Sequence, residues 1–462
     1  MLLSAASQQN SSYMVHQVHA HLVGILVLIC CICVIYGYEC KEGFLQHSII
    51  HQYHDQLNHR RPMLTDVFLS VNRSRIYGIV TLSTLRKLHG RTHKRTWVNP
   101  WNVTGDKVCK WTFEWPDGRK QLATLLEEDP TRENIIFYAK TSRRFSEIDY
   151  DTNQVQYVNV TGRATKRNTE VFHKVPFCVP KKNPIHHFMA ACTSTTGSMT
   201  VPKMVEWIAY HLLQGFTHFY IHFNGVSENN AFWTNNLKTY IDAGVVTLIN
   251  RMQPRLYKDL NRFQSSIFHS CLYRTRGRVE WLGLFDTDEF WVLPQENKGQ
   301  GLGTSTGVGK DLNKHRKLLV DWVKRDEFVN VSAIRSRTWH FGDTNEKSER
   351  EKAQGQRDQG IPLQLTKHTA HATEADYSRT KMLIRPNHVV WSTLRNITTN
   401  RENPDMFVYD IPVDRLFLVH FFLSGLRNFT DTSDVTGLGD IIPILKEVIA
   451  RQQTEFNPAN LG

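Results

Sequence analysis

The amino-acid sequence predicts an α/β fold whose main part is built on a parallel sheet. From about residue 176 onward, short apolar runs alternate with segments of helical spacing, which is typical of strands connected by helices. One apolar run, within Glu280–Trp291 (EWLGLFDTDEFW), ends abruptly in acidic residues, as expected where a buried strand reaches the edge of its sheet. Before residue 176, alternating runs without helical segments predict a separate β-rich region.

The expected elements of the main part follow from local patterns. Strands are expected where apolar residues are continuous, and helices where apolar residues recur every three or four positions. One helix is expected to begin after Thr200, because Pro202 suits a first turn, and to end at Gly215. Strands are expected at His187–Cys192, His218–Phe223, Val245–Ile249, Val279–Phe285, Val329–Arg335, Lys381–Arg385 and Leu416–Leu423, and further helices at Phe232–Asp242, Asn261–Arg274 and Lys317–Lys324.

The β-rich region is predicted at residues 71–175. Alternating runs at Arg75–Thr81, Lys110–Trp115 and Gln154–Val160 predict strands, and Pro116–Gly118 predicts a turn. These short strands indicate a small accessory region that precedes the main domain.

The amino-terminal end of the chain is apolar. No charged residue precedes Glu39, and the apolar run at residues 22–38 reaches the lower length limit of a membrane-spanning helix. Residues 1–21 are then a short tail, residues 22–38 a signal anchor, and residues 39–70 a polar, histidine-rich stem or linker. A cleaved signal peptide is the competing interpretation, and in both cases the bulk of the chain is translocated.

N-glycosylation patterns also favour a translocated protein. Because each pattern can arise by chance, their number carries more weight than any one of them. They occur at Asn72, Asn102, Asn159, Asn330, Asn396 and Asn428. The net charge of +12 comes from scattered basic residues without a recognisable nucleic-acid-binding module, so no nucleic acid partner is expected.

The eight cysteines show no paired C-x-x-C spacing outside the apolar amino-terminal run. One or two disulfides are expected in an oxidising compartment, with pairing that spacing does not define. Cys192 and Cys271 lie in apolar patterns, for which a buried free thiol is the expected state.

The acidic run predicts a metal site. Carboxylates in an aromatic setting are costly to bury unless a cation or hydrogen-bond donors meet them. In an extended segment Asp286 and Asp288 would point the same way and could converge on one ion. The alternative is a strand-end turn in which an aspartate caps free amides. His420, a polar residue in an apolar strand, is either a hydrogen-bonded core histidine or a further ligand, and such a set suits Mn²⁺, with Mg²⁺ second.

Three segments resemble motifs of glycosyltransferase family 92. They are Glu206–Gly225 (EWIAYHLLQGFTHFYIHFNG), Cys271–Arg276 (CLYRTR) and Trp281–Phe290 (WLGLFDTDEF), and they occur in the expected order. The similarity extends from about Phe188 to Phe429.

This resemblance implies both a fold and an activity. It implies a Rossmann-like GT-A domain at residues 176–462 that lies in the Golgi lumen behind a single-pass type II membrane anchor. It also implies inverting transfer of galactose from a nucleotide sugar, UDP-galactose, to a glycan on a glycoprotein, glycolipid or polysaccharide. An insert at Gly299–Gly309 and a charged loop at Asp343–Gly360 depart from the expected pattern and bear on acceptor specificity.

The resemblance assigns roles to residues of this chain. Asp286 and Asp288 match the motif that binds the metal and the diphosphate, and His420 matches a late histidine that completes the metal site. Arg274 is a candidate for the donor phosphates, with pairing to a surface acid as the alternative. Glu206 is a candidate for orienting the donor or the active-site backbone, with a solvent-facing helix carboxylate as the alternative. Inverting transfer also requires a general base, for which the candidates are Glu289, Asp343, Glu374 and Asp376.

A second hypothesis is a catalytically inactive lumenal relative that binds glycans with the same fold. Such a relative would be expected to have lost the acidic pair. The chain retains both Asp286 and Asp288, which favours the enzyme.

Overall fold

The computed structural model describes sixteen segments of the chain. Among their helices, none is long and apolar enough to span a membrane. The predicted anchor at residues 22–38, the insert at Gly299–Gly309 and the charged loop at Asp343–Gly360 lie outside these segments. The segments are residues 40–41, 44–45, 62–82, 110–128, 134–141, 155–163, 169–180, 186–195, 199–224, 227–251, 260–293, 318–341, 380–392, 397–399, 405–412 and 415–421.

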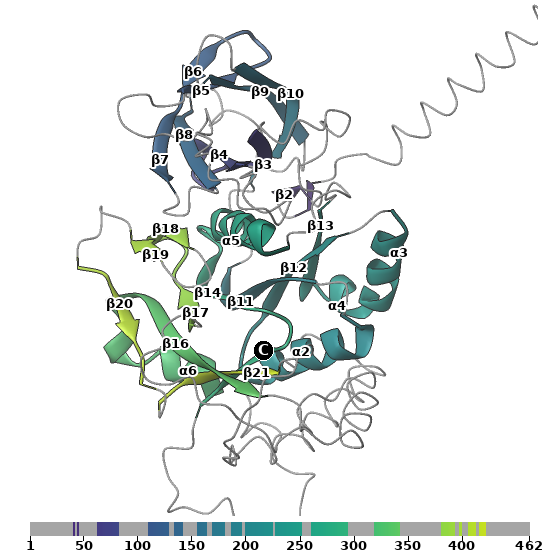
Figure 1. The fold of residues 1–462 in the computed structure, drawn as a ribbon, viewed down its shortest axis with the longest axis vertical. Coiled ribbons are helices and arrows are strands. Elements are labelled where there is room, and N and C mark those ends of the chain that lie inside the picture. The colour runs from purple at the N-terminus through teal and green to yellow at the C-terminus, as the bar shows by residue number, and fades with distance from the viewer. Residues whose placement is uncertain are drawn as a thin grey trace, which may run out of the picture. The chain divides into compact units, whose positions relative to one another are not determined.

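A mixed central sheet organises the part of the chain after residue 186 (Figure 1). Its strands are β11 (His187–Ser194), β12 (His218–Asn224), β13 (Val246–Arg251), β14 (Val279–Leu284), β15 (Glu289–Val292), β16 (Val331–Phe341), β17 (Thr380–Ile384), β20 (Phe407–Asp410) and β21 (Phe417–Phe421). Their order is β13-β12-β11-β14-β17-β16-β21-β15, with β20 also paired to β16. The neighbours β13, β12, β11 and β14 are parallel, which confirms the prediction, whereas β17 is antiparallel to β14 and β16.

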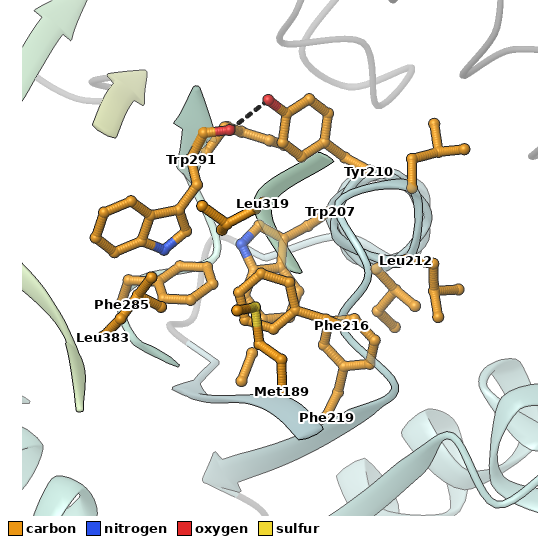
Figure 2. Close-up of a cluster of buried hydrophobic side chains, with 14 of the residues drawn as sticks. Met189, Trp207, Tyr210, Leu212, Phe216, Phe219, Phe285, Trp291, Leu319 and Leu383 are labelled. Atoms are coloured by element: carbon orange, nitrogen blue, oxygen red, sulfur yellow. Dashed lines mark hydrogen bonds between the residues drawn. The ribbon is translucent and has the colours of Figure 1, made fainter. Parts of the chain in front are cut away.

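Helix α2 (Val201–Leu213) packs on one face of this sheet, as Figure 2 shows. It starts after Thr200, has a proline in its first turn and stops before Gly215, whose φ of 94° suits a residue without a Cβ. The Trp207 indole donates to the Glu289 carbonyl at 3.1 Å, and the Tyr210 hydroxyl donates to the Trp291 carbonyl at 2.6 Å. These two bonds attach the helix to β15, which directly follows the acidic run.

The predicted helix at Phe232–Asp242 is divided in the structure. It consists of α3 (Ser227–Asn236) and α4 (Lys238–Asp242). Leu237 lies between them with φ −107° and ψ 13°, outside the helical region. The helix also begins earlier than predicted, because its first turn is polar and offers no apolar spacing to detect. Trp233, Leu237 and Tyr240 join the same buried cluster as α2, and α6 (Leu318–Val323) contributes to it as well.

Helix α5 (Leu260–Thr275) covers the opposite face of the sheet. Side chains of β11 alternate between the two faces, so that Ala191 packs with α2 while Ala190 and Cys192 pack with α5. A disulfide joins Cys192 to Cys271 of α5, with their Cα atoms 6.3 Å apart. The expectation of two free thiols is therefore wrong, because an apolar pattern indicates burial but not which buried cysteines meet. Cys178 is also disulfide-bonded.

The β-rich region contains two antiparallel sheets, the first of which begins at Pro62, before the predicted start at residue 71. One has the order β3-β4-β8-β7 and the other the order β10-β9-β5-β6. Trp111 of β5 stacks on Phe137 of β8 with ring centroids 4.6 Å apart, so the sheets pack face to face. Gly118, with φ 80°, closes the predicted turn. The strands are β3 (Pro62–Leu69), β4 (Arg75–Leu82), β5 (Lys110–Glu114), β6 (Lys120–Leu122), β7 (Thr124–Glu128), β8 (Asn134–Lys140), β9 (Val155–Arg163) and β10 (Thr169–Cys178).

The sheet that contains β3 and β4 packs directly on α5. Phe68, Tyr77 and Ile79 share a buried cluster with α5, which therefore lies between this sheet and the central sheet (Figure 1). Strand β3 begins at Pro62, within the segment expected to be a stem, and its residue Asp66 pairs with Arg274 of α5. All described residues belong to one compact unit. Small elements complete the structure: β1 (Cys40–Lys41), β2 (Phe44–Leu45), a 3-10 helix (Asp326–Phe328), β18 (Val389–Ser392) and β19 (Ile397–Thr399).

Candidate active site

The acidic residues form a tight turn at the carboxyl end of β14. The Glu289 amide donates to the Asp286 carbonyl at 3.1 Å, and the Asp286 amide donates to Glu289 Oε2 at 2.7 Å. The segment is therefore a turn and not extended, so the strand alternation on which the convergence of Asp286 and Asp288 was predicted does not apply here. The strand ends at Leu284, and beyond it the amides bond within the turn, where the capping carboxylate belongs to Glu289.

Strand pairing brings a lysine to this turn. In the antiparallel pairing of β14 and β17, Leu284 lies opposite Met382, so that Lys381 comes next to the start of the turn. Its ammonium lies 2.7 Å from Asp286 Oδ2 and 2.9 Å from Glu289 Oε2. From the other side, the side-chain amide of Gln264 on α5 donates to Asp286 Oδ1. Both oxygens of Asp286 thus have donors within the protein.

Strand pairing also brings a histidine to the turn. Glu289 of β15 lies opposite His420 of β21 in an antiparallel ladder. Nε2 of His420 lies 3.3 Å from Asp288 Oδ2, and its Nδ1 lies 3.7 Å from Glu289 Oε1. The structure therefore places Asp288, one of the two predicted aspartate ligands, beside His420.

The charged groups of the turn differ in exposure. The side chains of Asp286 and Asp288 are 31% and 25% exposed, whereas that of Glu289 is 1% exposed. Burial raises the pKa of Glu289, and the neighbouring aspartates raise it further against the opposing effect of Lys381. Burial by itself would lower the pKa of His420, but the hydrogen bond and charge of Asp288 raise it above the ordinary value. For Lys381, the two carboxylates likewise outweigh burial and raise the pKa.

The donor set fits a divalent cation. Asp288 and His420 offer a carboxylate oxygen and an imidazole nitrogen side by side, and both groups retain some exposure. This combination suits Mn²⁺, and oxygen ligands with water would also accept Mg²⁺. The oxygens of Asp286 already accept hydrogen bonds from Gln264 and Lys381, so Asp288 and His420 are the better placed pair to bind the cation.

Two other predicted site residues are buried on helices. Arg274 is 1% exposed and its guanidinium lies 3.2 Å from Asp66, an acid that is itself buried rather than on the surface. Burial lowers the pKa of Arg274, and Asp66 opposes that effect. Glu206 on α2 is 1% exposed, so the alternative of a solvent-facing carboxylate is wrong. The base candidates Asp343, Glu374 and Asp376 lie outside the described residues.

Gln264 and Lys381 were not identified from the sequence. Lys381 stands at the start of an apolar strand, where a basic residue is an ordinary flank. Gln264 stands on the first turns of a helix, where polar residues are common. Their importance depends on which strand and helix lie next to β14, and local spacing carries no information on that.

Comparison with known proteins identifies the family. Residues 187–430, more than half of the chain, match the model of Glycosyltransferase family 92. By class, the chain is a glycosyltransferase. It belongs to glycosyltransferase family 92, which confirms the resemblance of the motifs around the acidic turn.

Several curated relatives are similar to parts of the chain. The galactan β-1,4-galactosyltransferase GALS2 of Arabidopsis thaliana is 27% identical over 244 residues, which cover 48% of this chain and 44% of that protein. The galactan β-1,4-galactosyltransferase GALS3 of the same plant is 30% identical over 116 residues, which cover 25% of this chain and 23% of that protein. A glycosyltransferase family 92 protein of Ricinus communis is 26% identical over 152 residues, 32% of this chain and 22% of that protein. The chain therefore spans less than half the length of these relatives.

Proposed function

We propose that the chain is a metal-dependent, inverting glycosyltransferase with a GT-A fold that transfers galactose from UDP-galactose to a glycan acceptor. The observation that carries this proposal is the cluster of Asp286, Asp288 and His420 at the carboxyl end of a parallel strand. The activity in the names of the galactan β-1,4-galactosyltransferases to which the chain is similar supports galactose as the transferred sugar.

Asp288 and His420 would hold the Mn²⁺ ion, and Asp286 would serve the ion or the ribose of the donor from its fixed position. A bound divalent cation supplies neutralisation of the charge that develops on the departing diphosphate. Glu206 and Arg274 have buried positions on α2 and α5, and we assign neither of them a direct contact with the donor.

The general base would remove the proton of the acceptor hydroxyl. The Glu289 carboxylate is buried and accepts from the Asp286 amide and from Lys381, so we assign it a positioning role. Asp343, Glu374 and Asp376 remain the base candidates.

We further propose that the enzyme is a Golgi membrane protein of type II, anchored by residues 22–38, with a lumenal catalytic domain. The sequons at Asn72 and Asn330 support this placement, because both asparagines are exposed at turns. Glycosidase treatment of the expressed chain should increase its gel mobility, and Asn72→Gln with Asn330→Gln should reduce that shift. A chain without any shift would contradict the placement.

Transfer assays with the purified full chain test the activity. UDP-galactose, a β-galactan oligosaccharide and Mn²⁺ should give transfer that chelation abolishes and that Asp288→Ala lowers by about a hundredfold or more. The matched control is Asp242→Ala, which changes an exposed carboxylate in α4 and should retain activity. Equal activity of Asp288→Ala and the wild type would overturn the metal assignment. Glycan binding without donor turnover would favour an inactive relative instead.

A further inference from the structure

We infer that Lys381 is a built-in counter-cation of the acidic turn, which holds Asp286 and Glu289 in place and leaves Asp288 with His420 as the pair that takes the divalent ion. This inference rests on the proposed metal-dependent transfer and deepens it. It makes Lys381 a positioning residue, since its contacts are to the carboxylates of the turn.

The ammonium group of Lys381 forms ion pairs with two carboxylates at once. Its ammonium lies 2.7 Å from Asp286 Oδ2 and 2.9 Å from Glu289 Oε2, and its side chain is only 9% exposed. Surface lysines seldom keep one geometry, because holding the long side chain still costs conformational entropy. Here the neighbouring strands β14, β16 and β17 fix the stem of Lys381, and the two carboxylates provide oppositely charged acceptors for a group that burial removes from water.

The contacts divide the three carboxylates into two groups. Asp286 accepts from Gln264 and Lys381, and Glu289 accepts from the Asp286 amide and Lys381, so these two acids form one internally bonded unit. Asp288 instead lies 3.3 Å from Nε2 of His420, whose other ring nitrogen lies 3.7 Å from Glu289. Asp288 lies between these two acids in the sequence, so their fixed positions also restrict the position of its backbone.

The charges support the same division. Three carboxylates and one ammonium leave a formal charge of −2 with a neutral imidazole, which a divalent cation neutralises. Without the ammonium the turn would carry −3, and Asp286 and Glu289 would repel each other where little water can screen them. The expected consequence is a turn that depends on added metal for its structure and binds that metal more tightly.

The test compares full-length variants with Mn²⁺ alone as the probe. Lys381→Met should melt at a lower temperature than the wild type without metal, and Mn²⁺ should raise its Tm by more than it raises that of the wild type. Its Mn²⁺ affinity, measured from the paramagnetic resonance signal of free Mn²⁺, should be about tenfold tighter or more because one positive charge is lost nearby. Galactosyl transfer should fall, because metal would no longer be confined to Asp288 and His420.

The double variant Lys381→Met/Glu289→Gln keeps the formal charge of −2 and leaves an oxygen to accept from the Asp286 amide. It should recover most of the lost Tm and show the wild-type Mn²⁺ affinity. The control Lys238→Met removes an exposed lysine that pairs with Asp242 and should change neither quantity.

Two results would overturn the inference. One is an Mn²⁺ affinity of Lys381→Met that is unchanged or weaker in a folded protein. The other is a double variant whose Tm is no higher than that of Lys381→Met. Where Lys381→Met does not fold, the inference is overturned if the double variant also fails to fold, or if its Mn²⁺ affinity differs from that of the wild type by more than about threefold. A wild type that binds no Mn²⁺ would instead refute the proposed metal dependence, and the Tm comparison without metal would still test the role of Lys381.

Discussion

The three carboxylates of the acidic turn differ in the partners that each of them meets. Asp286 and Glu289 share Lys381, while Asp288 lies beside His420. The difference follows from strand pairing, because β17 delivers the lysine and β21 delivers the histidine. At the level of the single residue, the partner of each carboxylate is therefore determined by the strand that lies next to it.

His420 can be tested as a metal-binding group. His420→Ala should raise the Mn²⁺ concentration needed for half-maximal transfer by about tenfold or more, because removal of one ligand lowers the affinity of the site for Mn²⁺. The measurement is a Mn²⁺ titration of the transfer rate at saturating donor. His173→Ala, which changes an exposed histidine in β10, is the control and should leave the titration unchanged. An unchanged Mn²⁺ requirement in His420→Ala would exclude the histidine as a ligand.

At the level of elements, side chains of α2 donate hydrogen bonds to main-chain carbonyls of β15, the strand that follows the acidic turn. Trp207 donates to the Glu289 carbonyl, and Tyr210 donates to the Trp291 carbonyl at the other end of this short segment. Figure 2 shows the Tyr210 bond. The hydrophobic contacts of α2 hold the helix to the sheet, and the two hydrogen bonds connect it to β15, which pairs with β21. The order of the site thus depends on residues that contact no charged group in it.

Tyr210→Phe tests this support with almost no change in shape. The variant leaves the buried Trp291 carbonyl without its 2.6 Å donor, which should lower the free energy of unfolding by about 1–3 kcal/mol. Urea denaturation followed by tryptophan fluorescence provides the measurement. Tyr157→Phe changes a tyrosine that is 42% exposed and should alter stability by less than about 0.5 kcal/mol. Equal stability of both variants would mean that the Tyr210 hydrogen bond makes no net contribution to the free energy of unfolding.

A buried ion pair connects β3 to α5. Asp66 and Arg274 are each 1% exposed and lie 3.2 Å apart, and the guanidinium also lies over the Phe68 ring. Helix α5 carries Gln264, which donates to Asp286. The β-rich region is therefore attached to the same helix that contacts the acidic turn.

Removal of one partner of this pair should be strongly destabilising. Arg274→Met leaves the Asp66 carboxylate buried without its cation and should lower the free energy of unfolding by about 3–5 kcal/mol. Asp66→Asn in the same chain should recover part of this loss, and urea denaturation of the two single variants and the double variant measures the coupling. The exposed pair Lys238–Asp242 is the control, and Lys238→Ala should cost less than about 1 kcal/mol. A coupling energy near zero would contradict a cooperative link between the two parts.

At the level of the whole molecule, the core contains histidines whose side chains are neutral in the folded protein. Burial lowers the pKa of His211 to about 3, although its bond to the Trp207 carbonyl favours the charged form. Burial likewise lowers the pKa of His269 to about 3. In the unfolded chain these imidazoles titrate near 6.5, so the unfolded state binds more protons between pH 6.5 and about pH 3. Their contribution to stability is therefore present above pH 6.5 and is lost as the pH falls.

His211→Asn should reduce this acid sensitivity. Asparagine can still donate to the Trp207 carbonyl, yet it does not titrate, so the slope of unfolding free energy against pH should fall by about 1.4 kcal/mol per pH unit below pH 6. Denaturant titrations at several pH values between 7 and 4 measure the slope, and the exposed variant His173→Asn should keep the wild-type slope. Parallel slopes for His211→Asn and the wild type would show that His211 is not buried in the neutral state.

Much of the fold could be predicted from local patterns. The strand at Val279–Leu284, the helix after Thr200 and the parallel direction of β11 to β14 follow from apolar spacing and from alternating helices and strands. The break at Leu237 and the pairing of Cys192 with Cys271 could not be predicted, because both depend on contacts between elements far apart in the sequence.

The sequence by itself determined that a glycosyltransferase family 92 domain carries three carboxylates directly after an apolar strand, because side-chain types and their spacing are local properties. Only the tertiary structure decided which partners Asp286, Asp288 and Glu289 meet. Their partners Gln264, Lys381 and His420 come from one helix and two strands that sheet pairing and packing bring to the turn. The charge and burial of each carboxylate are properties of that assembled neighbourhood, which no single stretch of sequence contains.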